Sequence, residues 1–196
     1  HDLIRDTYIA HKRILFDGNG YSEEWVKEAQ RRGLKNIENT VDAIPALVTD
    51  KAIRLFERHH VLNRLELQSR AEINYEAYIK QINIEAKTMI DIASKQIRPA
   101  VIKYAGEVAQ SLAALRAVGM DTAVEEELLQ EINENIALFH KGLQHLEEVT
   151  TQAHLLKGSS RSQAVFYRDY VFAAMQQLRK PADKLEMLVD EKAWPF

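Results

Sequence analysis

The sequence contains no cysteine. This absence excludes disulfide bonds, thiolate metal sites and cysteine nucleophiles, and it suits a reducing compartment, so we expect a cytoplasmic protein. Neither sign of charge dominates, because 26 lysines and arginines face 29 aspartates and glutamates. A protein built mainly to bind nucleic acid would carry a basic surplus, so nucleic acid is not an expected partner. No segment approaches the ~20 consecutive apolar residues of a membrane span, so no membrane association is expected either.

Proline and glycine are also scarce, with four prolines and seven glycines among 196 residues. Between these helix breakers, apolar residues recur at steps of three and four, which is the periodicity of amphipathic helices. No segment alternates apolar and polar residues as a strand would. The sequence therefore predicts an all-α protein. It begins at His1, without methionine and within a helical pattern, so we expect a piece of a longer protein.

We expect residues 1–62 to form a small N-terminal cluster of short helices. Ser22 precedes an acidic pair and Thr49 precedes Asp50, so both are expected to cap helix N-termini. Between these helices we expect irregular chain with one helical turn, because Ile44 precedes Pro45 and a residue before proline resists the helical region. The helices expected are Asp2–Leu15, Glu23–Arg32 closed by Gly33, a turn at Asp42–Ile44, and Asp50–His60.

We expect residues 63–196 to form a long antiparallel three-helix bundle. Two of its helices form a helical hairpin arm, and the third helix extends it. The first helix is expected over Arg64–Val118, where Asn63 and Glu66 resemble a capping box. At ~1.5 Å per residue it would reach on the order of 80 Å, so it must project from a compact base. The other two helices are expected over Thr122–Leu156 and Ser160–Glu191, reversed by turns at Gly119 and Gly158. Kinks are expected at Pro99 and Pro181.

Two glycine-containing segments raise the possibility of phosphate binding. Gly18, Asn19 and Gly20 lack the lysine followed by serine or threonine of a phosphate-binding loop, so we interpret them as a turn that uses positive φ angles. The start of the helix after Ser22 could still accept an anion weakly. Lys157–Gln163, with the sequence KGSSRSQ, fits an anion site but fits a glycine helix end followed by a serine cap better.

Histidine and glutamate side chains can bind a metal or act as acid and base only if the fold brings several of them to one place. Neighbouring histidines, such as His59 with His60, diverge around a helix, and no Glu-x-x-His pattern for a di-iron bundle occurs twice. We therefore expect solvated positions for His11, His59, His60, His140, His145, His154, Glu125–Glu127, Glu147 and Glu148. The aromatic residues on the helix stripes are expected in the core: Tyr75, Tyr78, Tyr104, Phe139, Phe166, Tyr167 and Tyr170. No catalytic, cofactor-binding or metal-binding residue is predicted.

Four segments in the same order resemble one family. They are HKRILFDGNGYSEEWVKEAQRRGLKN, TVDAIPALVT, SRAEINYEAYIKQINIEAKTMIDIASKQIRPAVIKY and LRKPADKLEMLVDEKAWPF. Together they are similar to the C-terminal part of type III glutamine synthetase, the large-subunit bacterial form, along essentially the whole chain.

The resemblance implies a parent enzyme that joins ammonia to glutamate with ATP, through a γ-glutamyl phosphate, with divalent Mg or Mn. Its catalytic residues would lie before His1, so this chain alone is expected to be inactive, with no cofactor of its own. The expected partners are the parent catalytic domain and neighbouring subunits of a homo-oligomer, with apolar surface offered by Trp25, Trp194 and Phe196. The alternative is a free-standing helical protein-interaction module. A catalytic domain encoded upstream of His1 would favour the first hypothesis, and a start codon there the second.

Overall fold

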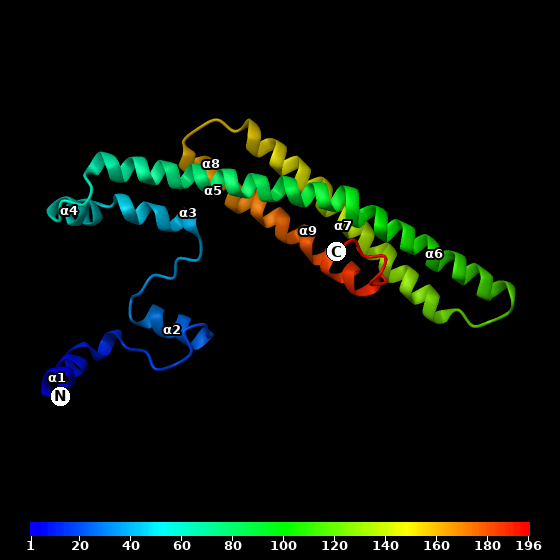
Figure 1. Ribbon diagram of the computed structural model, residues 1–196, viewed down its shortest axis with the longest axis horizontal. Coiled ribbons are helices and arrows are strands. Elements are labelled where there is room, and N and C mark those ends of the chain that lie inside the picture. Colours follow the sequence, from blue (N-terminus) through cyan, green and yellow to red (C-terminus); the bar gives the residue numbers. More distant parts are fainter.

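The computed structural model describes all 196 residues as helices joined by turns and loops, without strands, which confirms the all-α prediction. Two long rods dominate it (Figure 1). None of the helices is both long and apolar enough to cross a membrane. The α-helices are α1 (Asp2–His11), α2 (Glu23–Arg31), α3 (Thr40–Ala43), α4 (Asp50–Arg58), α5 (Arg64–Ile92), α6 (Arg98–Ala117), α7 (Ala123–Leu155), α8 (Ser160–Phe166) and α9 (Ala173–Leu188).

Helix starts follow the predicted caps. The side chains of Ser22 and Thr49 accept hydrogen bonds from the backbone N–H groups of Trp25 and Ala52. Asn63 and Glu66 form a complete capping box, since each side chain accepts a bond from the other residue's backbone N–H. These bonds satisfy N–H groups that the first helical turn leaves without partners, which fixes where α2, α4 and α5 begin.

The structure corrects the prediction for Ile44. Its φ of −53° and ψ of −42° are helical although Pro45 follows, and a 3₁₀-helix, η2 (Ile44–Val48), continues directly from α3. Ile44 is 3% exposed and packs with Val41 against Tyr75 of α5. Burial of an isoleucine side chain is worth about 2 kcal/mol, enough to outweigh the local preference of a residue before proline. Pro45 stands in the first turn of η2, where its missing N–H costs no bond.

Pro99 is accommodated by a change of helix type. Five residues of π-helix, η3 (Ala93–Ile97), join α5 to α6, and Pro99 stands at the start of α6. The proline ring crowds the carbonyl four residues earlier, which belongs to Lys95 inside η3, and the wider π turn gives that carbonyl room. The rod therefore continues to Ala117, and Figure 1 shows it extending well beyond the end of α9.

A second π segment, η4 (Tyr167–Phe172), joins α8 to α9. It precedes Pro181, which lies inside α9 without ending the helix. The kink expected at Pro181 stays a prediction. The chain reverses direction at Gly119 and Gly158, as predicted, and both glycines have positive φ.

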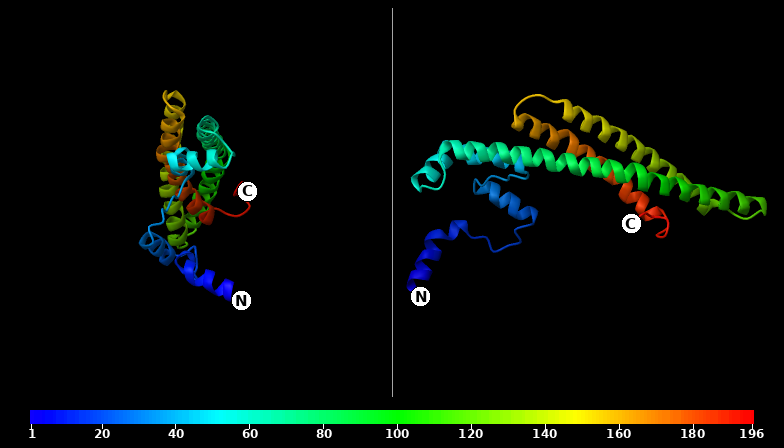
Figure 2. Two further views of the ribbon diagram at one scale, coloured as in Figure 1. Left: turned by 90° about the vertical axis from the view of Figure 1, so that its left-hand side faces the viewer. Right: turned by 45° about the horizontal axis from the view of Figure 1, so that its top comes forward.

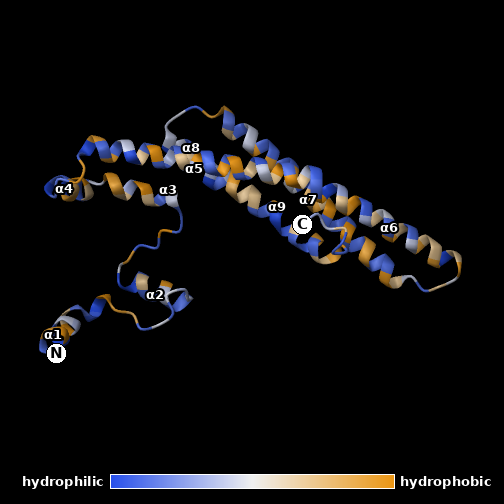
Figure 3. Cartoon of the chain, viewed as in Figure 1, coloured by the Kyte–Doolittle hydropathy of each residue, from blue (hydrophilic) through white to orange (hydrophobic).

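The bundle core lies where α7 packs between the α5–α6 rod and α9 (Figures 1 and 2). Hydrophobic and hydrophilic residues follow one another along every helix (Figure 3), and the buried hydrophobic residues of the three long helical segments form one core cluster. The fully buried side chains at its centre include Phe139, Leu143, Leu146, Leu178 and Leu185. Because α9 ends first, the far end of the arm consists of α6 and α7 alone (Figure 2).

The base of the arm is built by α3, η2 and α4, which lie along α5. A small second core joins Val41 and Ile44 to Tyr75, and the Arg168 guanidinium of η4 donates to Asp42 of α3 at 2.5 Å. Bonds from Asn39 and Arg168 hold the pKa of the Asp42 carboxyl below its usual range. Helices α1 and α2 stand away from the bundle (Figures 1 and 2). The division of the chain at residue 62 stays a prediction.

Candidate functional site

The loop Gly18–Gly20 is a turn held by its own atoms. Asn19 accepts a bond from the Tyr21 N–H at 2.9 Å, and its carbonyl accepts one from Ser22. The expected positive φ angles were wrong, because neither Gly18 nor Gly20 has one. A Cβ at Gly18 would lie 2.5 Å from the outer end of the Phe16 ring, so the ring lies over this glycine. The loop therefore folds onto an aromatic ring and leaves no cradle for a phosphate.

Arg32 organises the contacts around this turn. Its guanidinium donates to the carbonyls of Arg13 and Leu15 at 2.9 and 2.7 Å, and it lies 5.9 Å from the centre of the Trp25 ring. Trp25 in turn packs on Phe16, with ring centres 4.5 Å apart. These contacts tie the end of the 3₁₀-helix η1 (Lys12–Ile14) to α2 as one N-terminal unit.

Glu28 supplies the negative charge of this unit. Bonds from Arg31 and Arg32, at 2.6 and 2.5 Å, lower the pKa of its carboxyl to about 2. Lys12 and Arg13 join the two α2 arginines around a hollow of about 770 Å³. The hollow lies at the C-terminal ends of η1 and α2, where cations balance the partial negative charge of the last carbonyls. Arg31 and Arg32 thus have a local structural role, since both bind Glu28.

The segment Lys157–Gln163 uses its polar atoms for capping. Ser159 accepts a bond from the Ser162 N–H at 3.2 Å, and the Gln163 side chain donates to the Gly158 carbonyl. This arrangement confirms the interpretation as a helix end followed by a serine cap. The Ser162 and Gln163 N–H groups of this helix start are thus bonded to Ser159.

The candidate histidines and glutamates are not brought together. All six of these histidines are exposed, which confirms the predicted solvated positions, and no three His, Asp or Glu side chains are grouped as metal ligands would be. Among the acids, Glu126 has a definite role: it accepts bonds from Thr122 and from Arg116, the latter at 2.8 Å, which lower its pKa. This ion pair closes the tip of the hairpin between α6 and α7.

The aromatic stripe is mostly core, as predicted. Phe139 is fully buried, and Tyr75 and Tyr167 are less than 5% exposed, so burial raises the pKa of both tyrosines. Tyr170 departs from the prediction, because it is 54% exposed and stacks on Phe166 at the surface. Of this set, Phe139 borders a largely apolar hollow of about 530 Å³, which is lined also by residues of α5, η3 and α9.

Of the three residues expected to offer apolar surface at the segment ends, Phe196 is 70% exposed, and its contact with a partner stays a prediction. Trp25 is half-buried on Phe16, and Trp194 packs against the bundle core. The structure shows two apolar surfaces that the sequence interpretation missed. One is α1, which has no buried residue and exposes Leu3, Ile4, Tyr8 and Ile9. Their apolar spacing was visible, but not that nothing in the chain covers them.

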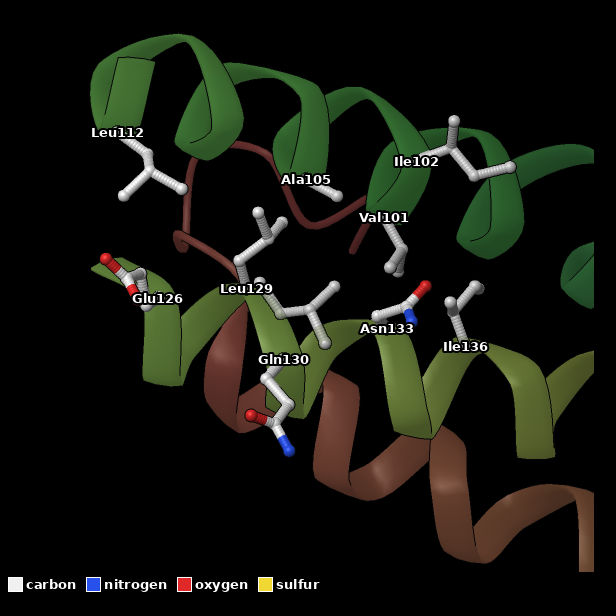
Figure 4. Close-up of a pocket in the computed structure, with 10 residues that line it drawn as sticks. Val101, Ile102, Ala105, Leu112, Glu126, Leu129, Gln130, Asn133 and Ile136 are labelled. Atoms are coloured by element: carbon white, nitrogen blue, oxygen red, sulfur yellow. The ribbon is translucent and has the colours of Figure 1, made fainter. Parts of the chain in front are cut away.

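The second apolar surface is a groove of about 680 Å³ between α6 and α7 (Figure 4). We call it the tip groove. Its α6 wall is formed by Val101, Ile102, Ala105 and Leu112, and its α7 wall by Glu126, Leu129, Gln130, Ile132, Asn133 and Ile136. Of its lining residues, Val101 and Ile132 belong to the bundle core, so the groove opens along the edge of that core (Figure 4).

Comparison with known proteins shows the family to which the chain belongs. A family model described as the glutamine synthetase C-terminal domain matches residues 1–116. The chain belongs to the glutamine synthetase C-terminal domain family. The match covers α1 to α6 almost completely, so the returning helices α7 to α9 of this C-terminal domain lie beyond it.

Three relatives align with nearly the whole domain. A glutamine synthetase of Butyrivibrio fibrisolvens is 35% identical over 193 residues, which is 97% of this chain and 27% of that protein. A type-3 glutamine synthetase of Dictyostelium discoideum is 33% identical, over 98% of this chain and 27% of the relative. A glutamine synthetase of Bacteroides fragilis is 27% identical, over 99% and 27%. This C-terminal domain thus spans about a quarter of the length of the curated relatives it matches.

Proposed function

We propose that this chain is the non-catalytic scaffold of a type III glutamine synthetase. The observation that carries the proposal is that the chain spans only 27% of relatives named glutamine synthetase while forming one long helical arm on a small base. The polar side chains at its candidate motifs are engaged in caps, turns and ion pairs. Such an arrangement suits positioning and assembly rather than bond making.

The chemistry of the whole protein then belongs to the rest of the polypeptide. That chemistry is the ATP-dependent ligation of ammonia to glutamate in the cytoplasm, through a γ-glutamyl phosphate, with Mg or Mn. The length of the relatives supports this assignment over a free-standing interaction module. We propose that the apolar face of α1 contacts the catalytic domain and that the arm contacts neighbouring subunits of a homo-oligomer.

Shortening the arm in the full-length enzyme tests its proposed role. The variant lacks residues 106–134 and joins the cut ends with a short glycine-containing turn, so that the remaining parts of α6 and α7 still pair. We expect a smaller assembly, seen as a lower sedimentation coefficient. A matched control inserts two Gly-Ser pairs after Gly119 and leaves the arm intact. Identical sedimentation of the shortened and control enzymes would reject the assembly role.

The absence of catalysis in this chain has a separate test. The 196-residue chain is expected to give no glutamyl transfer and no heat of ATP binding with Mg or Mn present. The full-length enzyme in the same assay is the positive control. Measurable glutamyl transfer by the chain alone would contradict the scaffold assignment.

A further inference from the structure

One exposed side of α7 carries a row of six residues that follow one another at steps of four, three, four, three and four. This spacing places them along one side of the helix. All six are exposed, whereas Ile132, Phe139 and Leu146 lie on the side of α7 that the bundle core covers. The six residues, which we call the α7 stripe, are Glu127, Glu131, Glu134, Leu138, Lys141 and His145.

The charge of the α7 stripe changes sign along its length. Its first half holds three glutamates, and its second half holds Lys141 and His145. Neither these glutamates nor Lys141 forms an ion pair within the chain. The Gln130 amide donates to Oε1 of Glu134 at 2.9 Å, which leaves the other carboxylate oxygen of Glu134 free. The stripe thus presents an acidic surface beside a basic one, both without counter-charges.

Helix α9 adds two lysines to the basic half. Lys180 and Lys184 lie one turn apart, and together with Lys141 they line a polar hollow of about 750 Å³ between α7 and α9. The one acid that lines this hollow is Asp183, and its carboxylate is bonded to Arg179 at 3.3 Å. The hollow therefore carries a surplus of positive charge.

The lysines of this hollow differ from those of the α5–α6 rod. Lys80 and Lys95 each pair with an acid one turn away. Lys180 and Lys184 have each other at that spacing, and like charges one turn apart weaken a helix. An acidic surface supplied by another molecule would relieve this repulsion.

A second α7 stripe, running in the opposite direction, supplies that acidic surface. The steps of the stripe read the same in both directions, so two stripes related by a two-fold axis match residue for residue around position 136. This match brings the acidic half of each copy onto the basic half of the other. The facing pairs are Glu127 with His145, Glu131 with Lys141, and Glu134 with Leu138.

Glu134 meets the lysines of α9 in this register. Leu138, which it faces, lines the hollow beside Lys180 and Lys184. The free carboxylate oxygen of Glu134 thus approaches two ammonium groups of the other copy. Leu138 is 55% exposed and supplies the apolar surface nearest to the two-fold axis.

We infer that two copies of this chain pair antiparallel through their α7 stripes, the acidic half of each on the basic half of the other. This inference rests on the proposed assembly role and names its surface. A second copy is the occupant because one chain carries both halves of the contact. Each charge contact therefore occurs twice in the pair.

Sedimentation of the 196-residue chain over a range of concentrations tests the pairing. We expect a reversible dimer that added salt weakens, since salt screens exposed charges. Glu131→Lys and Lys141→Glu should each weaken it about tenfold or more, because each replaces two attractive contacts with two repulsive ones.

Glu147→Lys is the matched control for these charge reversals. It makes the same charge change as Glu131→Lys, at an exposed residue about 160° around α7 from Glu131. Its dimer should be as strong as that of the unsubstituted chain. Circular dichroism verifies that all three variants keep their helices.

A mixture of the two charge-reversed chains tests the antiparallel match. The Glu131→Lys chain has two basic positions in the contact, and the Lys141→Glu chain has two acidic ones. Each chain repels its own copies, but the two attract each other at both positions. The equimolar mixture should therefore form heterodimers about as strong as the unsubstituted dimer.

Cysteines locate the register, because the chain has none of its own. A mixture of the Glu127→Cys and His145→Cys chains should form disulfide-linked dimers on mild oxidation, since these two positions face each other. The Glu127→Cys chain alone should not, because two copies of position 127 lie roughly 27 Å apart along the helices at 1.5 Å per residue.

Three results would overturn the inference. The first is a chain that stays monomeric at every concentration in low salt. The second is a dimer that Glu131→Lys and Glu147→Lys weaken equally, and the third is a mixture of charge-reversed chains that pairs no better than either chain alone. The assembly role is judged separately, by the shortened arm in the full-length enzyme, so the two proposals fail independently.

Discussion

Gly142 of α7 lies directly against the backbone of Leu178 in α9, so that a Cβ at position 142 would be 3.2 Å from the Leu178 Cα atom. A helix-interior glycine normally weakens its helix. Here its small size lets α7 and α9 approach closely, and the buried Leu178 side chain packs into the core beside it. The close packing of α7 on α9 thus depends on Gly142, a residue that weakens the helix in which it lies.

Gly142→Val is expected to lower the free energy of unfolding by about 1–3 kcal/mol, because the branched side chain meets backbone rather than a movable side chain. Urea denaturation followed by circular dichroism measures the loss. Gln144→Val, at an exposed position of the same helix, reports the helix-propensity cost of valine, which is a few tenths of a kcal/mol. Equal losses in the two variants would show that the close approach does not matter.

His60→Gly is expected to stabilise the chain by up to about 1 kcal/mol. His60 ends α4 with a φ of 52°, a left-handed conformation that glycine adopts without the steric cost of a Cβ. The His60 and Val61 N–H groups donate to Glu57 and Phe56, the bonding of a Schellman motif, where glycine is usual.

His59→Gly is the matched control for this substitution. His59 has ordinary negative φ, so glycine there adds only flexibility and is expected to destabilise slightly. Thermal unfolding of both variants decides the question. A lower melting temperature for His60→Gly than for the unsubstituted chain would contradict the strain argument.

Much of the fold could be predicted because its signals are local. Ser22, Thr49 and the Asn63–Glu66 pair mark helix starts through bonds that span three residues. The glycines that close α2 and α6 act through their own φ angle, and the apolar stripes follow the helical period. The interpretation of Lys157–Gln163 as a helix cap could be made from the sequence for the same reason, because Ser159 and Ser162 form that cap within one turn.

What the sequence did not show depends on contacts between distant segments. Ile44 becomes helical because α5 buries it, and the Phe16 ring lies over Gly18, whose φ angle is not positive. The tip groove depends on which residues of α6 and α7 the rest of the chain covers, and spacing within each helix says nothing about that. Periodicity gives the apolar side of a helix but not the neighbour that covers it.

Thr150→Val is expected to raise the free energy of unfolding by about 1 kcal/mol. The Thr150 hydroxyl is buried in α7 without a hydrogen-bond partner, and valine replaces it with a methyl group of similar size that carries no desolvation cost. Thr151→Val is the control, because the exposed Thr151 hydroxyl donates to the Glu147 carbonyl. Chemical denaturation measures the free energy of unfolding of both variants. A lower value for Thr150→Val than for the unsubstituted chain would indicate that the Thr150 hydroxyl has a hydrogen-bond partner.

The N-terminal unit is expected to loosen in acid through Glu28. The pKa of its carboxyl is lowered from 4.5 to about 2 by the arginine bonds, so the unfolded unit binds a proton more readily than the folded one. The stabilisation is therefore fully present above pH 4.5 and is lost as the pH falls through about 2. Trp25 reports the change, because it packs on Phe16 beside Arg32.

Fluorescence of Trp25 in a Trp194→Phe background, recorded as a pH titration, measures this loosening. Glu28→Gln should show the loosened Trp25 signal already at neutral pH, since a neutral amide replaces the carboxylate that both arginines bind. Glu23→Gln, at an exposed acid of the same helix, should titrate like the parent chain. If Glu28→Gln keeps the packed Trp25 signal at neutral pH, the cluster is held by the Arg32 bonds to the Arg13 and Leu15 carbonyls alone, and the charge of Glu28 is dispensable.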